Sequence, residues 1–216
     1  MTAAPPRPSG QRQPGRRPPG QVRGALIAAG LELARAGGPD AVALREATRR
    51  VGVVPNAAYR HFADRDALLA EVGVAAMGEL ARRMREQVAA VTDQGDPKET
   101  AILRLGALGV AYLDFAMQET GLFETAFAVP RHLEYATGAA GEGLGPVPFQ
   151  LLGAALDELV AAGVLPAGRR PDAQYPVWAS VHGMAVLITR GPLRELPEPF
   201  VRHVADQLFA FITRGL

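Results

Sequence analysis

Apolar side chains recur every three or four residues along most of the chain, which is the period of an amphipathic α-helix. The first such segment covers residues 22–36 and ends at Gly37-Gly38-Pro39, where glycine permits a C-terminal turn and proline cannot continue a helix. A second segment runs over residues 44–51. Gly52 then supplies a tight turn, and a third helix begins near Pro55, whose missing N–H suits a first helical turn. The pattern predicts three short helices around a small core.

The remaining two thirds of the chain also has helical periodicity, and β-branched residues are too scattered to indicate strands. Asp64 is expected to cap a long helix that ends near Val91. Asp172 is expected to cap a later helix that buries Tyr175 and Val186. Residues 131–145 contain four glycines without periodicity and are expected to form a mobile loop. Other helices are expected over residues 97–120, 122–127, 146–162 and 200–212. We therefore predict an all-α fold.

Composition narrows the class of protein. The 216 residues are 48% hydrophobic, which is enough for a sizeable core, and include no cysteine, which excludes disulfides and thiol catalysis. No apolar run approaches the roughly 20 residues that span a bilayer, and no secretory signal is evident at the start. We expect a soluble, cytoplasmic protein that does not associate with membranes.

Charge is distributed unevenly along the chain. Residues 1–70 contain eleven arginines and five carboxylates, a net charge of +6, whereas residues 71–216 carry −5. A basic N-terminal part suits a polyanionic partner such as nucleic acid. Residues 1–20 are rich in Pro, Gly and Arg with almost nothing apolar to bury, and are expected to be a disordered basic tail.

The third predicted helix has an unusual surface for its size. Small residues would let this helix approach a groove closely, and Asn, Tyr, Arg and His can donate hydrogen bonds there. Asn pairs with adenine, Arg with guanine, and alanine can contact a thymine methyl group. The surface favours a helix-turn-helix that reads a DNA major groove. The candidate DNA-binding residues on this surface are Pro55, Asn56, Ala57, Tyr59, Arg60 and His61.

Residues 23–69 resemble the N-terminal domain of the TetR family of transcriptional repressors. The similar residues are Leu44-Arg45-Glu46, Gly52-Val53, Tyr59-x-His61-Phe62, Asp66 and Leu68-Leu69. The resemblance implies a homodimer, a palindromic double-stranded DNA operator and a C-terminal domain that binds a small-molecule effector. It also implies a helix-turn-helix domain at residues 21–68 and a helical ligand-binding and dimerisation domain at residues 69–216.

The resemblance also assigns roles to single residues, and it adds Arg45 and Val54 to the candidate DNA-binding residues. Tyr59, His61 and Arg45 would contact phosphates, while Asn56, Ala57 and Arg60 would face bases or the adjacent backbone. For Tyr59 the alternative is a ring packed under the domain, and for His61 it is a helix-end cap. Relatives commonly have Ser or Thr at the position of Ala43, and Ser at that of Val54. Both positions are expected to be helix N-caps, so this chain lacks two capping hydroxyls.

A ligand pocket is expected among the C-terminal helices. Trp178-x-x-x-His182-Gly183 resembles a motif of a subgroup of TetR C-terminal domains that is called WHG after these letters. Such pockets are mostly apolar with a few polar groups. For each residue taken alone, ordinary core is the favoured alternative, with His182 bonded to a backbone carbonyl. The candidate lining residues are Tyr112, Phe115, Met117, Phe123, Phe127, Phe149, Trp178 and His182.

The last helix carries an apolar stripe at Val201, Val204, Leu208 and Phe211. In the family the two terminal helices form a four-helix bundle with those of a second copy, so these residues are candidates for dimerisation. The alternative is that the stripe packs within one chain.

The sequence shows no pattern typical of catalysis. The four histidines are not spaced with acidic residues as metal ligands, and no nucleotide-binding glycine motif or nucleophile elbow occurs. We therefore expect no enzyme activity, no cofactor and no metal. The main alternative function is a small-molecule sensor that acts through a protein partner, with DNA binding weakened by the missing caps.

Overall fold

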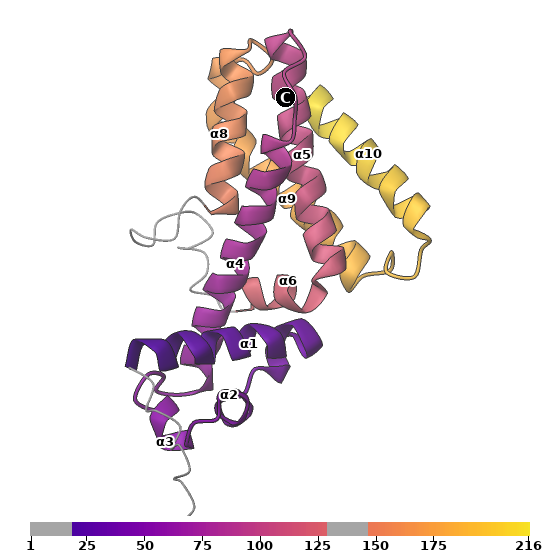
Figure 1. Ribbon diagram of the computed structural model, residues 1–216. Helices are drawn as coiled ribbons and strands as arrows, with labels where there is room; N and C mark the ends of the chain where they lie inside the picture. Colours follow the sequence, from indigo (N-terminus) through magenta and orange to yellow (C-terminus); the bar gives the residue numbers. More distant parts are fainter. Residues whose placement is uncertain (1–18, 129–146) are drawn as a thin grey trace, which may run out of the picture.

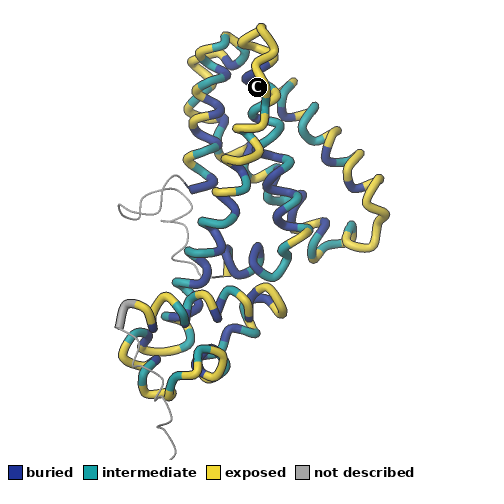
Figure 2. Tube along the Cα trace, in the orientation of Figure 1, coloured by how far each residue is buried: buried dark blue, intermediate teal, exposed yellow. Residues whose placement is uncertain are grey.

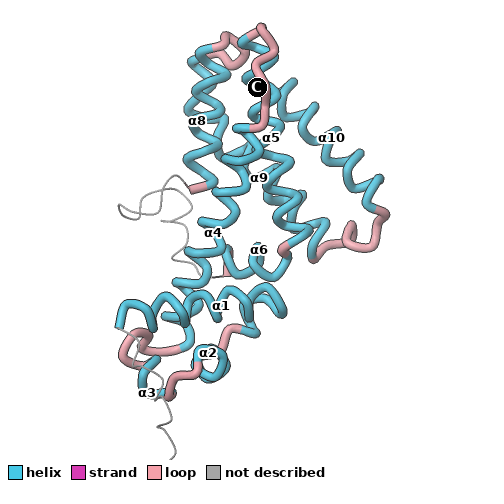
Figure 3. The backbone as a smooth tube through the Cα atoms, viewed as in Figure 1, coloured by secondary structure: helices cyan, strands magenta, loops and turns pink. Residues whose placement is uncertain are grey.

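Helices are the only regular elements in the part of the chain that the computed structural model describes, residues 19–128 and 147–216 (Figure 3). The small N-terminal domain contains α1 (Pro19–Ala41), α2 (Leu44–Val51) and α3 (Pro55–Ala58). The larger part contains α4 (Arg65–Ala89), α5 (Pro97–Gln118), α6 (Thr120–Ala126), α8 (Pro148–Ala161), a 3₁₀ turn (Ala167–Arg169), α9 (Arg170–Thr189) and α10 (Glu198–Gly215).

The small domain packs α2 and α3 against α1, and α1 lies against α4. Leu26, Val42 and Leu68 are fully buried at its centre. α1 is interrupted at Gly37 and Gly38, where Gly38 has a φ of 68°, and the break predicted at this glycine pair is therefore present. This interruption turns the chain towards α2, and the helix-turn-helix itself consists of α2, the turn at Gly52 and α3.

The long helix α4 leads from the small domain into the larger one, where α5 runs through the middle of the bundle (Figure 1). α6 lies across the lower end of this bundle, directly above α1. Buried positions face the interior of both parts, and one hydrophobic core extends from α1 to α10 (Figure 2). The small domain therefore rests on α4 and α6 rather than hanging from a flexible linker.

The central helix α5 is strongly apolar. Its length and a mean hydropathy of 1.4 would suit a membrane span, although 56% of this stretch is buried inside the protein. Because α4, α8 and α9 pack around α5, its composition is that of a core helix.

Two expectations about α9 are wrong. The helix begins at Arg170 with Arg169 as its N-cap, so Asp172 lies inside the first turn, where its charge still complements the helix dipole. Tyr175 and Val186 are 59% and 40% exposed rather than buried. The side of α9 that carries these two residues is therefore apolar and exposed to solvent.

The prediction of a disordered basic tail over residues 1–20 is wrong for residues 19 and 20, which belong to α1, because the helix begins at Pro19. Residues 1–18 and the loop expected at residues 131–145 lie outside the described residues.

Candidate nucleic-acid interface and ligand cavity

The turn before α3 has the geometry that its glycine predicts. Gly52 adopts a φ of 73°, and its N–H donates to the carbonyl of Thr48 at 3.0 Å. The N–H of Val53 donates to the same carbonyl at 3.1 Å. A residue with a left-handed backbone conformation and these hydrogen bonds ends a helix and redirects the chain sharply. The turn therefore fixes the direction in which α3 leaves α2.

α3 and the turn that follows it have a buried side and an exposed side. Ala58 and Phe62 are 0% and 3% exposed and hold the segment against the core. On the other side Val54 is 69% and Tyr59 56% exposed. The predicted residues Pro55, Asn56 and Arg60 are also exposed, Ala57 and His61 are half-buried, and Arg45 is exposed at the start of α2. The exposed Tyr59 ring does not match the alternative of a ring packed under the domain.

The arginines of this domain differ in whether they already have partners. Glu46 accepts hydrogen bonds from Nε and Nη2 of Arg49, at 2.9 and 2.8 Å, and from Nε of Arg50 at 3.2 Å. These bonds, that from Arg49 most of all, lower the pKa of Glu46 to about 2. Among the described residues no carboxylate pairs with Arg45 or Arg60. These two arginines could bind DNA without first breaking an ion pair.

Arg65 and Arg23 are structural rather than DNA-facing. Arg65 donates from Nε to the carbonyl of Val42 at 2.9 Å and from Nη2 to that of Pro39 at 2.6 Å. Arg23 lies over the Phe62 ring and forms an ion pair with Glu71 of α4. These contacts tie the helix-turn-helix to α1 and α4.

The two missing caps are confirmed as N-cap positions. Ala43 precedes α2 and Val54 precedes α3, both with extended backbones and without a side-chain bond to the first turn. Asp64 shows the contrast, because its carboxylate accepts from the N–H of Ala67 at 2.8 Å at the start of α4. The uncapped N–H groups at the starts of α2 and α3 could donate to phosphates.

Restoring a cap should stabilise the protein measurably. We expect Val54→Ser to raise the free energy of unfolding by about 0.5–2 kcal/mol, because serine can accept from an N–H of the first turn of α3. Thermal denaturation followed by circular dichroism measures this, and a DNA titration should show tighter binding. Val54→Ala removes the same bulk without adding an acceptor and is the control. Equal stability of the serine and alanine variants would contradict the prediction.

Four of the predicted pocket residues form a closed aromatic cluster. Tyr112 of α5 lies against Phe123 of α6, with ring centroids 5.7 Å apart, and His182 of α9 lies 4.7 Å from Phe127. The Tyr112 hydroxyl and Nδ1 of His182 share a hydrogen bond of 2.9 Å. Burial lowers the pKa of His182 and raises that of Tyr112, so both side chains are neutral near pH 7. These rings pack against one another, and Tyr112 also borders a cavity.

The other four predicted pocket residues are divided between different surroundings. Phe115 is fully buried beneath the Arg83 guanidinium, 5.2 Å from the ring centroid, and Met117 is half-buried. Phe149 lies 5.4 Å from Trp178, which in turn lies 6.0 Å from His182. Trp178 therefore joins the second group to the aromatic cluster, and none of the three spaces beside α10 is bordered by all eight residues.

A cavity of about 50 Å³ does lie beside this cluster, between α4, α5, α8, α9 and α10. Of the eight predicted residues only Tyr112 and Trp178 border it. Met84, Gly109 and Phe209 also border the cavity but were not predicted. They come from three separate helices, and periodicity does not specify how these helices pack together. No side chain that borders the cavity is charged.

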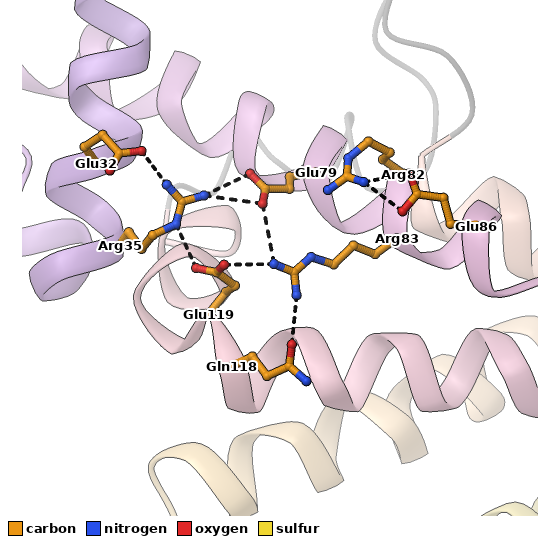
Figure 4. A network of polar contacts seen from close by, with 8 residues as sticks. All are labelled: Glu32, Arg35, Glu79, Arg82, Arg83, Glu86, Gln118 and Glu119. Carbon is orange, nitrogen blue, oxygen red and sulfur yellow. Dashed lines mark hydrogen bonds and ion pairs between the residues drawn. The ribbon is translucent and has the colours of Figure 1, made fainter.

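Ion pairs connect the small domain to the larger one (Figure 4). Arg35 of α1 donates to Glu119, which follows α5, at 2.9 Å and to Glu79 of α4 at 3.2 Å. Arg83 of α4 donates to the same Glu119 at 2.8 Å and to Gln118 at 3.2 Å. Glu119 is only 16% exposed, so it is screened from water less than most surface carboxylates. The network joins α1, α4 and the end of α5.

The terminal helices expose apolar side chains that no described residue covers. Of the predicted dimerisation residues, Phe211 is 67% exposed, Val204 and Leu208 are half-buried, and Val201 packs inside its own chain with 7% exposure. The residues that share this exposed character are Phe200 and Phe211 on α10 and Tyr175, Val186 and Leu187 on α9. We call these five residues the terminal stripe.

The described residues contain no group of three or more His, Cys, Asp or Glu side chains that could hold a metal ion. Nor does this part of the chain contain a buried side-chain nitrogen or oxygen atom without a hydrogen-bond partner.

The small domain, with its left-handed turn and exposed second helix, defines a helix-turn-helix DNA-binding protein. A family model for bacterial regulatory proteins of the tetR family matches residues 26–72, and a model for the tetracyclin repressor-like C-terminal domain matches residues 105–212. The chain belongs to the TetR family of transcriptional regulators. The all-α architecture with an N-terminal helix-turn-helix domain is thereby confirmed.

Several solved structures share this fold. A protein of unknown function from Rhodococcus sp. RHA1 shares 25% sequence identity with this chain, and the TM-score is 0.70. The match covers 95% of this chain and 99% of the Rhodococcus chain. The TetR family regulator PfmR from Thermus thermophilus is 21% identical with a TM-score of 0.55, covering 88% and 98%. A putative tetR family regulator from Shewanella sp. PV-4 is 18% identical with a TM-score of 0.57, covering 87% and 95%. None of the curated proteins matches the sequence.

Proposed function

We propose that this protein is a ligand-responsive, sequence-specific DNA-binding regulator, namely a repressor released from a palindromic operator by a small apolar or amphipathic effector. It acts in the cytoplasm as a homodimer, without enzyme activity or a cofactor. Membership of the TetR family supports DNA binding and regulation of transcription. The observation that carries the proposal is the exposed face of α3, where Asn56 and Tyr59 stand beside Arg60, which has no ion-pair partner among the described residues.

The proposed mechanism uses the spacing of two recognition helices in a dimer. In such dimers these helices enter successive major grooves about 34–36 Å apart, one turn of DNA. An effector that binds more tightly to a dimer with a different spacing shifts the population towards it, and DNA is released. α4 supports this route because it joins the helix-turn-helix to the cavity beside Met84.

A DNA titration tests the proposal. Labelled DNA from beside the protein's own gene is titrated over a range of salt concentrations, with a scrambled duplex of equal length as the control. We expect specific binding with a steep salt dependence, because phosphate contacts release counterions. Equal and weak binding to both duplexes would contradict sequence-specific regulation through DNA.

The absent hydrogen bonds at Ala43 and Val54 favour one other function, a small-molecule sensor that acts through a protein partner. In that case DNA binding would have been weakened by the loss of the two caps. Weak nonspecific binding in the titration would support the sensor. Specific binding would support the regulator.

Truncating one residue of the terminal stripe tests the proposed dimer. Burying a phenylalanine side chain contributes about 1.5–3 kcal/mol, so Phe211→Ala should raise the dissociation constant of the dimer about tenfold or more. Sedimentation velocity over a concentration series measures this constant. Leu103→Ala, which removes an exposed apolar side chain of α5 outside the stripe, is the control. Unchanged dissociation of the Phe211 variant would mean that the stripe is not the dimer interface.

A further inference from the structure

The last helix, α10, has unfilled space on several sides. The cavity of about 50 Å³ lies beneath its inner face, a groove of about 530 Å³ separates it from α4 and α5, and a third space of about 290 Å³ separates it from α9. Figure 1 shows α10 diverging from the bundle towards its N-terminal end. A helix with so little packing around it can shift at lower cost than α5 or α8.

Phe209 of α10 lies between the cavity and the α4–α5 groove, and it borders both. Its ring rests directly on the backbone of α5 at Gly109, where an added Cβ would lie 2.3 Å from Cε1 of the ring. Gly106, one turn earlier, also borders both spaces, and a Cβ there would meet nothing within 4 Å. The ring on Gly109 thus separates the two spaces, and Gly106 lies open beside it.

Neither space, the cavity or the groove, offers a charged side chain as a partner for an ion. A charged ligand would therefore lose its hydration without gaining a partner of opposite sign. The polar groups deep inside are already engaged, because the Tyr112 hydroxyl bonds to His182 and the Thr213 hydroxyl donates to the Phe209 carbonyl at 2.9 Å. Uncharged polar side chains, Gln87, Thr92 and Gln94, stand at the outer end of the groove.

We propose that an uncharged, largely apolar small molecule binds between α5 and α10 by displacing the Phe209 ring from Gly109, which merges the cavity and the groove into one site over Gly106 and Gly109. The cavity alone holds no more than a few water molecules, whereas sites for small molecules usually measure about 300–1,000 Å³. The groove alone falls in that range but is open to solvent. Displacement of the ring supplies both the volume and the enclosure.

The effect of this ligand on DNA affinity rests on the proposed function. Met84 of α4 borders the cavity, and the preceding residue, Arg83, donates to Glu119 in the network that reaches Arg35 of α1. A ligand that displaces Phe209 would also shift α10, which carries part of the terminal stripe. The site is therefore connected both to the small domain and to the proposed dimer surface.

Two fluorescent probes of similar ring size test the site. N-phenyl-1-naphthylamine is uncharged, and 8-anilino-1-naphthalenesulfonate carries a negative charge. We expect saturable binding of the uncharged probe by the full chain, with an affinity at least about tenfold higher than that of the anion, since an unpaired buried charge is unfavourable. Phe209→Ala, which removes the ring, should tighten binding of the uncharged probe severalfold.

Gly106→Leu is the decisive variant, because its side chain would enter the space between the two helices without a clash at Cβ. It should weaken binding of the uncharged probe at least about tenfold, which corresponds to about 1.4 kcal/mol, while the midpoint of thermal unfolding stays the same or rises. Gly78→Leu is the matched control, since Gly78 is also helical, has nothing within 4 Å of an added Cβ and borders neither space.

Three results would overturn the site: no saturable binding to the unaltered protein, equal affinity for both probes, or equal effects of Gly106→Leu and Gly78→Leu. Dissociation of the dimer by Gly106→Leu would also overturn it, because the groove would then be covered by a second copy. Probe binding is measured without DNA, so its failure is distinct from a failure of operator binding. If the site is present but the probe leaves DNA affinity unchanged, the connection to operator release is lost and the site stands.

Discussion

Gly121→Ala is expected to weaken specific DNA binding at least about tenfold by moving the small domain away from the larger one. Gly121 is in α6, and an added Cβ would lie 2.1 Å from the carbonyl oxygen of Ala34 in α1. It would also lie 3.1 Å from the oxygen of Arg35 and from the nitrogen of Gly38. All three are backbone atoms, so no side-chain rotation can relieve the contact. α1 and α6 must separate, and the helix-turn-helix moves with α1.

The same variant should also be less stable. Overpacking of this kind costs about 1–3 kcal/mol, and a domain of this size loses roughly 2–4 °C of unfolding midpoint per kcal/mol. Circular dichroism melting measures the midpoint, and fluorescence anisotropy measures DNA affinity. Gly78→Ala is the matched control, because an added Cβ there meets nothing within 4 Å and alanine favours helix.

The two readouts identify the cause. A loss of affinity greater than the unfolded fraction accounts for would indicate that the domain has moved. A lower melting midpoint with unchanged affinity would mean that the α1–α6 contact stabilises the protein without positioning the recognition helix. Equal behaviour of the Gly121 and Gly78 variants would contradict the role proposed for the contact between α6 and α1.

The sequence predicts well those features that depend on neighbouring residues. The break at Gly37 and Gly38, the left-handed turn at Gly52 and the cap at Asp64 each follow from backbone freedom or from one side-chain acceptor. The absence of capping bonds at Ala43 and Val54 is predictable for the same reason. Each of these features is decided within about four residues, so no knowledge of the tertiary fold is required.

Features that depend on helix packing could not be predicted in this way. Arg35 and Glu119 are far apart in sequence, and either residue alone resembles an ordinary charged surface side chain. The cavity depends on how Phe209 of α10 meets Gly109 of α5, which periodicity does not specify. The signal available in the sequence was the pair Gly106 and Gly109, one turn apart in an apolar helix, because glycine lets another helix approach closely.

The terminal stripe shows a further limit of periodicity. Tyr175 and Val186 continue the apolar pattern of α9, which predicts burial, yet both are exposed. An apolar helix face has the same pattern whether it packs against its own chain or against another molecule. The same ambiguity applies to α10, where Val201 packs inward and Phe211 faces solvent.

Arg60→Ala should have the largest effect among single changes to the exposed face of α3. A bidentate contact between arginine and a base contributes about 1–3 kcal/mol, so we expect specific affinity to fall roughly tenfold to a hundredfold. Arg49→Ala is the matched control, because Arg49 already donates two hydrogen bonds to Glu46 and has less reason to contact DNA. Anisotropy titrations with the specific and the scrambled duplex measure both affinities.

The comparison of the two duplexes decides what Arg60 contacts. If Arg60 reads a base, its loss weakens binding to the specific duplex far more than to the scrambled one. If it contacts only phosphate, binding to both duplexes weakens equally, and the dependence on salt falls by about one counterion. Equal losses for Arg60→Ala and Arg49→Ala would contradict the division between paired and unpaired arginines. Specificity would then have to come from Asn56 and from contacts that the small residues of α3 allow.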